Sequence, residues 1–195
     1  TEFWRAHDIV FPEVKRSNDI VPMVNAYLAA DSLAIVPAIT YLYRDRPGAT
    51  SMTSKVGSRD SLRSYLRQET ACSELVADHA AMDAFERVFA VRDGWVQVSR
   101  YLIELEDDPV DPEIADQVRH LWSLVGPPVR AELAVNRYLT FEAITGPTPE
   151  VAKDAAYGLN PKLAVDDPAR WLDAGLRLLH DHRDLFASEL VIRAG

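Results

Sequence analysis

The chain has 195 residues, of which 48% are hydrophobic and 26% are charged, and its formal net charge at pH 7 is -9. These values predict one folded domain with a sizeable core over residues 1–195, and they argue against intrinsic disorder. The acidic balance argues against nucleic acid and anionic membrane surfaces as partners. No apolar stretch reaches the roughly 18 to 20 residues that a membrane-spanning helix needs.

The use of cysteine and of basic residues indicates where the protein works. A single cysteine, Cys72, excludes an internal disulfide bond and is typical of a reducing compartment, so we expect a cytoplasmic protein. Most of the basic residues are arginine, and alanine, aspartate and valine are abundant. This composition is typical of GC-rich bacterial genomes, and it predicts a bacterial source.

Residues 1–17 are expected to form an arm that docks on the body of the domain, because three aromatic residues gather there, namely Phe3, Trp4 and Phe11. Asp19 is expected to cap a first helix. A second helix is expected from Asp31 to about Arg44, with a kink at Pro37.

Residues 46–59 are rich in proline, glycine, serine and threonine and are expected to form the longest loop. Helices are expected at about 60–68 and 70–91. The segment 89–106 is ambiguous, because Asp93-Gly94 is typical of a hairpin turn while apolar residues recur at helical spacing. We favour a helix, because the rest of the chain has helical patterns; a hairpin would make the fold α+β.

Pairs of a capping residue and proline indicate the later helices. Asp111-Pro112 opens one that ends near Gly126, and Pro127-Pro128 opens one that ends at Gly146. A short helix at about 149–157 and a last helix at about 169–192, opened by Asp167-Pro168, complete the chain. The pattern therefore predicts an all-α, single-domain helical bundle of about seven to nine helices.

Polar residues inside the apolar stripes of these helices are the candidate functional residues, because a buried polar group needs a partner or a ligand. His182 lies within the apolar arc of the last helix, beside Trp171 in angle. Gly175 shares that arc, where it admits either a close backbone neighbour or a flat ligand. A core histidine with an ordinary hydrogen bond is the structural alternative.

In the helix expected at 70–91, Cys72, His79 and Glu86 follow one another at seven-residue spacing. Such residues are about 10 Å apart along the helix, so they cannot bind one metal ion without a second helix. His182, in the last expected helix, is the natural candidate for the additional metal ligand. Two histidines and a carboxylate suit non-haem iron, and haem ligation by His182 is a weaker alternative. In the structural alternative, these three residues form only a half-exposed polar flank of the helix.

Arg137, Asn136 and Thr140 share the inner face of the helix expected at 128–145. A buried arginine needs a carboxylate, carbonyl groups or an anionic ligand. Arg137 is therefore a candidate for binding an anionic substrate, and Glu86 is its alternative internal partner. Asn136, Thr140 and Trp171 are the other candidate substrate-binding residues.

Two other patterns are rejected. Asp107, Asp108 and Asp111 have the spacing of an aspartate-rich magnesium motif, but two prolines break the helix that such a motif requires. Cys72 lacks a histidine close enough to activate it as a nucleophile.

Two functional hypotheses follow from these residues. In the first, the protein is a small bacterial enzyme, and His79, Glu86 and His182 bind a metal ion or act as acid and base in the oxidation or tailoring of an anionic small metabolite. In the second, it is a non-catalytic regulatory module that binds a small molecule or forms a homodimer.

Overall fold

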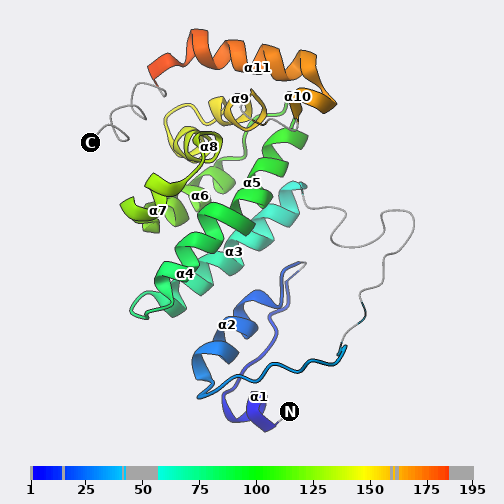
Figure 1. Ribbon diagram of the computed structural model, residues 1–195, viewed down its shortest axis with the longest axis vertical. Coiled ribbons are helices and arrows are strands. Elements are labelled where there is room, and N and C mark those ends of the chain that lie inside the picture. Colours follow the sequence, from blue (N-terminus) through cyan, green and yellow to red (C-terminus); the bar gives the residue numbers. More distant parts are fainter. Residues whose placement is uncertain are drawn as a thin grey trace.

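A computed structural model describes residues 2–14, 16–40, 42, 57–158, 160 and 163–184. Over these ranges the chain forms helices and no strand (Figure 1), which confirms the all-α fold. The elements are α1 (Glu2–Ala6), α2 (Ile20–Ala29), α3 (Arg59–Val76), α4 (Met82–Arg87), the π-helical turn η2 (Val88–Arg92), α5 (Asp93–Glu104), α6 (Pro112–Leu124), α7 (Pro127–Glu132), α8 (Val135–Thr145), α9 (Val151–Gly158), α10 (Leu163–Asp166) and α11 (Pro168–Asp181).

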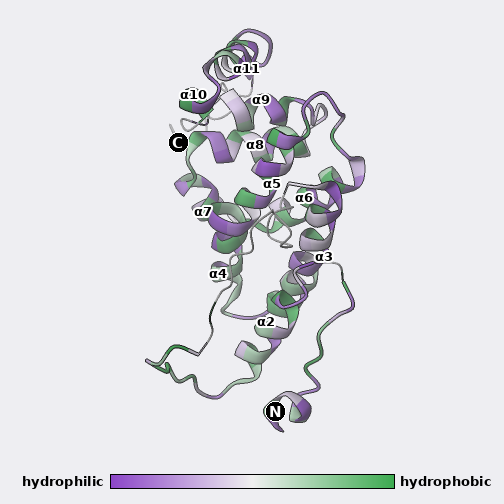
Figure 2. Cartoon of the chain, turned by 90° about the vertical axis from the view of Figure 1, so that its right-hand side faces the viewer, coloured by the Kyte–Doolittle hydropathy of each residue, from purple (hydrophilic) through white to green (hydrophobic). Residues whose placement is uncertain are grey.

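The helices form a bundle with a middle and two ends. Helix α3 packs against α2, α5 and α6, while α8 packs against α6 and α9. At one end α11 lies across α9, and at the other end α2 lies beside α3 (Figures 1 and 2). Helix α11 thus covers α9 at one end of the bundle, and α2 covers α3 at the other.

Aromatic rings fill the middle of the bundle. The ring of Phe141 on α8 stacks on Trp122 of α6 at 4.9 Å between centroids, and it contacts Phe89 of η2 at 5.4 Å. Trp95 of α5 meets the same ring edge-on at 6.3 Å. Large apolar groups of this kind supply most of the free energy of folding, so this cluster ties α5, α6, α8 and η2 together.

The predicted helix starts at 111 and 167 are confirmed. The side chain of Asp111 accepts a hydrogen bond from the backbone N–H of Glu113 at 3.0 Å, and Asp167 accepts one from Arg170 at 3.2 Å. A proline follows each cap at the first helical position, where its missing N–H costs nothing. The segment 89–106 contains η2 and α5, so the hairpin alternative is wrong.

The helix predicted from Asp31 to Arg44 is wrong for the residues that the structure describes. Residues 31–40 contain no helix, and their large apolar side chains are exposed. Pro37 disfavours helical backbone at the residue before it, and β-branched residues beside it favour extended backbone. The rest of that predicted helix from 43 onward, and 46–56 of the predicted loop, lie outside the described residues.

Three helix boundaries also differ from those predicted. Helix α11 ends at Asp181, before His182, whereas the predicted helix continued to about 192. Residues 59–76 form one continuous helix, α3, which ends in a turn before α4. The helix predicted at 128–145 is divided into α7 and α8, and Leu133 between them has extended backbone with ψ of 144°. The breaks after α3 and α7 contain neither proline nor glycine, so the sequence pattern continued through both.

The N-terminal arm meets α3 at Arg16. Its backbone N–H donates to the Ser64 hydroxyl at 3.2 Å, and that hydroxyl donates to the Arg16 carbonyl at 2.7 Å. Farther along the arm, Trp4 stacks on Phe11 at 5.6 Å between ring centroids. These two aromatic residues of the arm thus contact each other.

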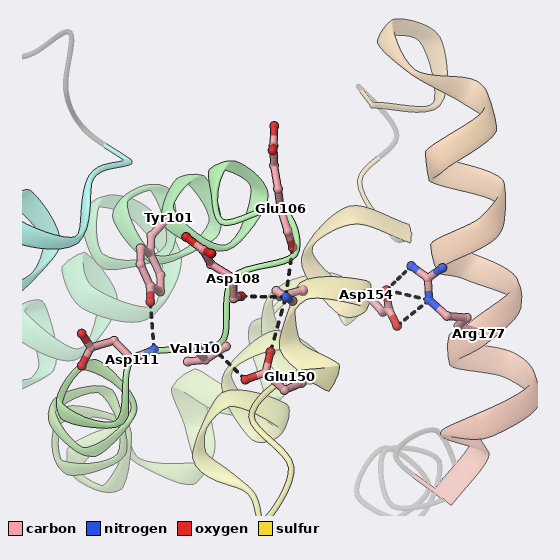
Figure 3. A network of polar contacts seen from close by, with 9 residues as sticks. Tyr101, Glu106, Asp108, Val110, Asp111, Glu150, Asp154 and Arg177 are labelled. Carbon is pink, nitrogen blue, oxygen red and sulfur yellow. Dashed lines mark hydrogen bonds and ion pairs between the residues drawn. The ribbon is translucent and has the colours of Figure 1, made fainter.

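A polar network fastens the loop after α5 to the far end of the bundle (Figure 3). The ammonium group of Lys153 on α9 donates to the carbonyl groups of Glu106 and Asp108, at 3.0 Å each. Arg177 of α11 forms an ion pair with Asp154 of α9 at 2.6 Å. The acidic loop is thus held by α9 through its backbone carbonyls.

None of the helices in the described ranges combines the length and the apolar character needed to cross a membrane.

Candidate functional site

Of the three side chains predicted to bind a metal, His79 and Glu86 lie on consecutive segments, whereas His182 lies at the other end of the bundle. His79 is exposed in the turn between α3 and α4, and its Nδ1 accepts a hydrogen bond from the backbone N–H of Ala81 at 3.0 Å. Glu86 is half-buried on α4. His182 follows α11 at the other end of the bundle (Figure 1). Among the described residues, no group of three His, Cys, Asp or Glu side chains could hold a metal ion.

The described residues give the predicted metal centre no support, and the physical reason is the turn after α3. A continuous helix over 70–91 would have aligned Cys72, His79 and Glu86 on one flank. Because α3 ends at Val76, the seven-residue spacing no longer places these three side chains on a common stripe.

Glu86 has a structural partner. Its Oε2 accepts a hydrogen bond from the backbone N–H of Gly126 at 2.6 Å. Gly126 directly precedes α7, so the carboxylate satisfies a donor at the start of that helix, where negative charge is favourable. The predicted role of Glu86 as a partner of Arg137 is replaced by this contact.

The residues predicted to bind an anionic substrate are engaged within the protein. Arg137 donates to the carbonyl of Val91, the last-but-one residue of η2, and its guanidinium lies 5.8 Å from the Trp95 ring centroid. The Thr140 hydroxyl is wholly buried and donates to the carbonyl of Asn136 at 2.6 Å. An internal ion pair with Glu86 was the structural alternative for Arg137, and the structure instead shows a hydrogen bond to a carbonyl group.

Trp171 and His182 lie on the outer layer of the bundle. Trp171 is half-buried on α11, and its indole nitrogen has no hydrogen-bond partner within the part of the chain that is described. His182 lines a hollow of about 430 Å³ beside the end of α8, together with Asp181 and Asp184. These two residues are therefore separated from the turn that holds His79.

The feature that the structure adds is an apolar pocket between α2, α3 and the α4–η2 segment. Its volume is about 320 Å³, at the small end of the range of ligand pockets. Aliphatic and aromatic side chains make up nearly all of its wall. The lining residues are Ile20, Val24, Tyr27, Leu28, Glu69, Cys72, Val76, Ala81, Ala84, Phe85 and Val88.

Glu69 is the only charged residue among those that line this pocket. Its side chain lies on α3 and is 4% exposed. Burial raises the pKa of its carboxyl group from 4.5 to about 7, and the negative charge of Asp93 adds to that rise. Near neutral pH, the pocket therefore contains a carboxyl group that is easily protonated or deprotonated.

Two further groups of α3 lie next to Glu69. The Tyr65 hydroxyl approaches the carboxyl group and offsets part of its pKa rise, although the geometry falls short of an ordinary hydrogen bond. Burial, then the charge of Glu69, raise the pKa of Tyr65 well above 10.0, and they raise that of the Cys72 thiol to about 12. Both groups are neutral at physiological pH.

A larger hollow between α3 and α6, about 590 Å³ in volume, has a different character. Arg67 and Glu113 on its wall already form an ion pair with each other at 2.9 Å. Asp116 on the same wall forms an ion pair with Arg119. The carboxyl group of the apolar pocket, by contrast, is not paired with any basic side chain among the described residues.

The apolar pattern of α3 contains a signal for Glu69 that the sequence-based prediction did not use. Residues at spacing three and four along α3 form one stripe, and the other members of that stripe are apolar: Leu62, Tyr65, Cys72 and Val76. A carboxylate at the centre of such a stripe is buried and needs a partner. The predicted break between 68 and 70 divided the stripe and hid this position.

Comparisons of the chain with protein-family models, with curated proteins and with solved structures found no match.

Proposed function

We propose that this protein is a non-catalytic binding module for a small hydrophobic molecule, which occupies the pocket between α2, α3 and the α4–η2 segment. The observation that carries the proposal is the pocket itself, an apolar cavity of about 320 Å³ with a single ionisable carboxyl group in its wall. Concave apolar sites with few polar groups are typical of small-molecule binding.

The position of α2 supports a regulatory role for that binding. One wall of the pocket comes from α2, and the other walls come from α3, α4 and η2. Helix α2 packs on α3 at the edge of the bundle (Figure 2). A ligand in the pocket would contact α2 on one side and α3 on the other. Its binding would therefore stabilise the position of α2 on α3. We place this function in the cytoplasm, in keeping with the one free, buried cysteine.

The metal-dependent oxidation predicted from the sequence is not the function that the geometry supports best. It requires His79, Glu86 and His182 to converge, and among the described residues no three His, Cys, Asp or Glu side chains are grouped so that they could hold a metal ion. The binding module requires no such convergence.

The test uses a pocket-filling variant and a matched control. Ala84 is exposed at the edge of the pocket, so Ala84→Phe is expected to occupy the cavity without disturbing the core. Ala131 is an exposed alanine of α7 away from the pocket, and Ala131→Phe is the control. The probe is n-butylbenzene, a neutral apolar molecule, with binding measured by calorimetry and by the rise in melting temperature.

We expect the natural protein and Ala131→Phe to bind n-butylbenzene, with an increase in melting temperature at saturating probe. Ala84→Phe should lose binding at least about tenfold, which corresponds to about 1.4 kcal/mol. Equal binding by all three proteins, or no binding by the natural protein, would overturn the proposal.

A further inference from the structure

We propose that the ligand of this pocket is a cationic amphiphile, a small apolar molecule with one protonated amine, and that the Glu69 carboxylate is its counter-ion. This inference rests on the proposed function, because it names the chemical class of ligand that the pocket between α2, α3 and the α4–η2 segment binds. It is carried by the position of Glu69, a buried carboxyl group in an apolar wall that contains no basic residue.

The charges around Glu69 favour a cation. Besides Glu69, the titratable groups that face the pocket or influence this carboxyl group are Tyr65 and Cys72 on α3, Asp93 at the start of α5 and Tyr27 on α2. None of these groups is a basic side chain. Among the described residues, the site therefore offers the negative charge of Glu69 and no positive group, and like charge would repel an anionic ligand.

Desolvation of the carboxylate explains why a protonated amine should bind more tightly than a neutral ligand of the same size. Burial removes the water that would solvate a carboxylate, and without a basic partner no other interaction compensates for the lost free energy of hydration. A bound ammonium group would restore a charge-assisted hydrogen bond inside a cavity of low polarity, where such bonds are strongest. A hydroxyl group in the same place would also donate a hydrogen bond to the carboxylate but would bring no positive charge, so the pocket should distinguish the two.

The rest of the wall suits the apolar part of such a molecule. Aliphatic side chains from α2 and α3 surround the cavity, and two of the lining residues, Tyr27 and Phe85, are aromatic. Aromatic faces also attract ammonium groups. The arrangement of one carboxyl group within an apolar wall thus matches a molecule with one charged end and an apolar body.

The experiment compares n-octylamine, which is protonated near neutral pH, with n-octanol, which has the same chain and no charge. Binding is measured by calorimetry at a pH of about 8, where Glu69 is ionised. The variant Glu69→Gln removes the charge and keeps the shape. Glu74→Gln is the matched control, because Glu74 is an exposed residue of the same helix that does not line the pocket.

We expect the natural protein and Glu74→Gln to bind n-octylamine at least about tenfold more tightly than n-octanol. In Glu69→Gln this preference should disappear, while binding of n-octanol remains. Equal affinity for the two probes in the natural protein, or a preference that persists in Glu69→Gln, would overturn the inference.

A pH series on the natural protein gives a second measurement that needs no variant. As the pH falls below about 7, Glu69 becomes protonated while the amine stays charged, so the preference for n-octylamine should decline. A constant preference from about pH 5 to pH 8 would also contradict the inference. Failure of both probes to bind would refute the proposed function itself, whereas equal binding of both would refute only the choice of a cationic ligand.

Discussion

Gly158 of α9 and Gly175 of α11 meet backbone to backbone where the two helices cross. A Cβ atom on Gly158 would lie 2.6 Å from the backbone nitrogen of Gly175 and 2.8 Å from its Cα. A Cβ atom on Gly175 would lie 3.6 Å from the Gly158 carbonyl oxygen, which is ordinary van der Waals contact. The crossing therefore requires glycine on α9 more strictly than on α11.

This asymmetry predicts opposite effects for two similar substitutions. Gly158→Ala should lower the free energy of unfolding by about 1–3 kcal/mol, because backbone atoms of α11 must move to admit the methyl group. Gly175→Ala should be neutral or stabilising by up to about 1 kcal/mol, because alanine favours helix and has room. Urea unfolding measures both values, and equal losses from the two variants would contradict the asymmetric crossing.

The same pair of glycines shows what a sequence can and cannot specify. The pattern placed Gly175 on the apolar arc of the last helix and left two explanations, a close backbone neighbour or a flat ligand. The structure supplies the neighbour, Gly158, which lies seventeen positions earlier in the chain. No periodicity within one helix identifies its partner in another, so this choice required the tertiary structure.

The fold class was predictable because local signals agreed with one another. Capping pairs such as Asp111 with Pro112 indicated where helices begin. The spacing of apolar residues by three and four indicated helix rather than strand. In the candidate site, Glu69 was predictable from the apolar stripe of α3, but the pocket around it was not, because its wall continues past a turn at 77–81 that contains neither proline nor glycine. That turn separates His79 from the stripe to which the sequence assigned it.

Glu86 provides a direct test of structural against metal-binding roles. Glu86→Ala should lower the free energy of unfolding by about 1–3 kcal/mol, because the backbone N–H of Gly126 loses its acceptor. His79→Ala should change stability by no more than about 0.5 kcal/mol, because His79 is exposed. Thermal unfolding of both variants checks this. A large loss from His79→Ala would show a role that its surface position does not explain.

Glu69 predicts an unusual dependence of stability on pH. Its pKa rises on folding from 4.5 to about 7, so the folded state holds a proton that the unfolded state releases in this range. The free energy of unfolding should therefore fall as the pH rises through that interval, by up to about 3 kcal/mol, and Glu69→Gln should lack this contribution.

The measurement for Glu69 is the difference in unfolding free energy between the natural protein and Glu69→Gln, taken by urea unfolding at a series of pH values. Taking the difference cancels the contributions of the other titrating groups. Parallel curves across the interval would mean that the pKa of Glu69 does not change on folding.

Cys72 reports whether α2 leaves its position on α3. The thiol is 1% exposed and lines the pocket that α2 helps to enclose, and burial raises its pKa to about 12. Because alkylation needs both access and the thiolate, iodoacetamide should react with the native protein very slowly. Val24→Ala removes an apolar contact from the pocket side of α2, and a loss of about 1.4 kcal/mol there would increase the open population about tenfold.

The rate of Cys72 alkylation, followed by mass spectrometry, should therefore rise about tenfold in Val24→Ala. The control is Met23→Ala, since Met23 is an exposed residue of α2 that does not line the pocket, and it should react like the natural protein. Saturation with n-octanol should slow the reaction by stabilising the docked helix. If Val24→Ala reacts no faster than Met23→Ala, then departure of α2 does not control access to the pocket, and the coupling of ligand binding to α2 is wrong.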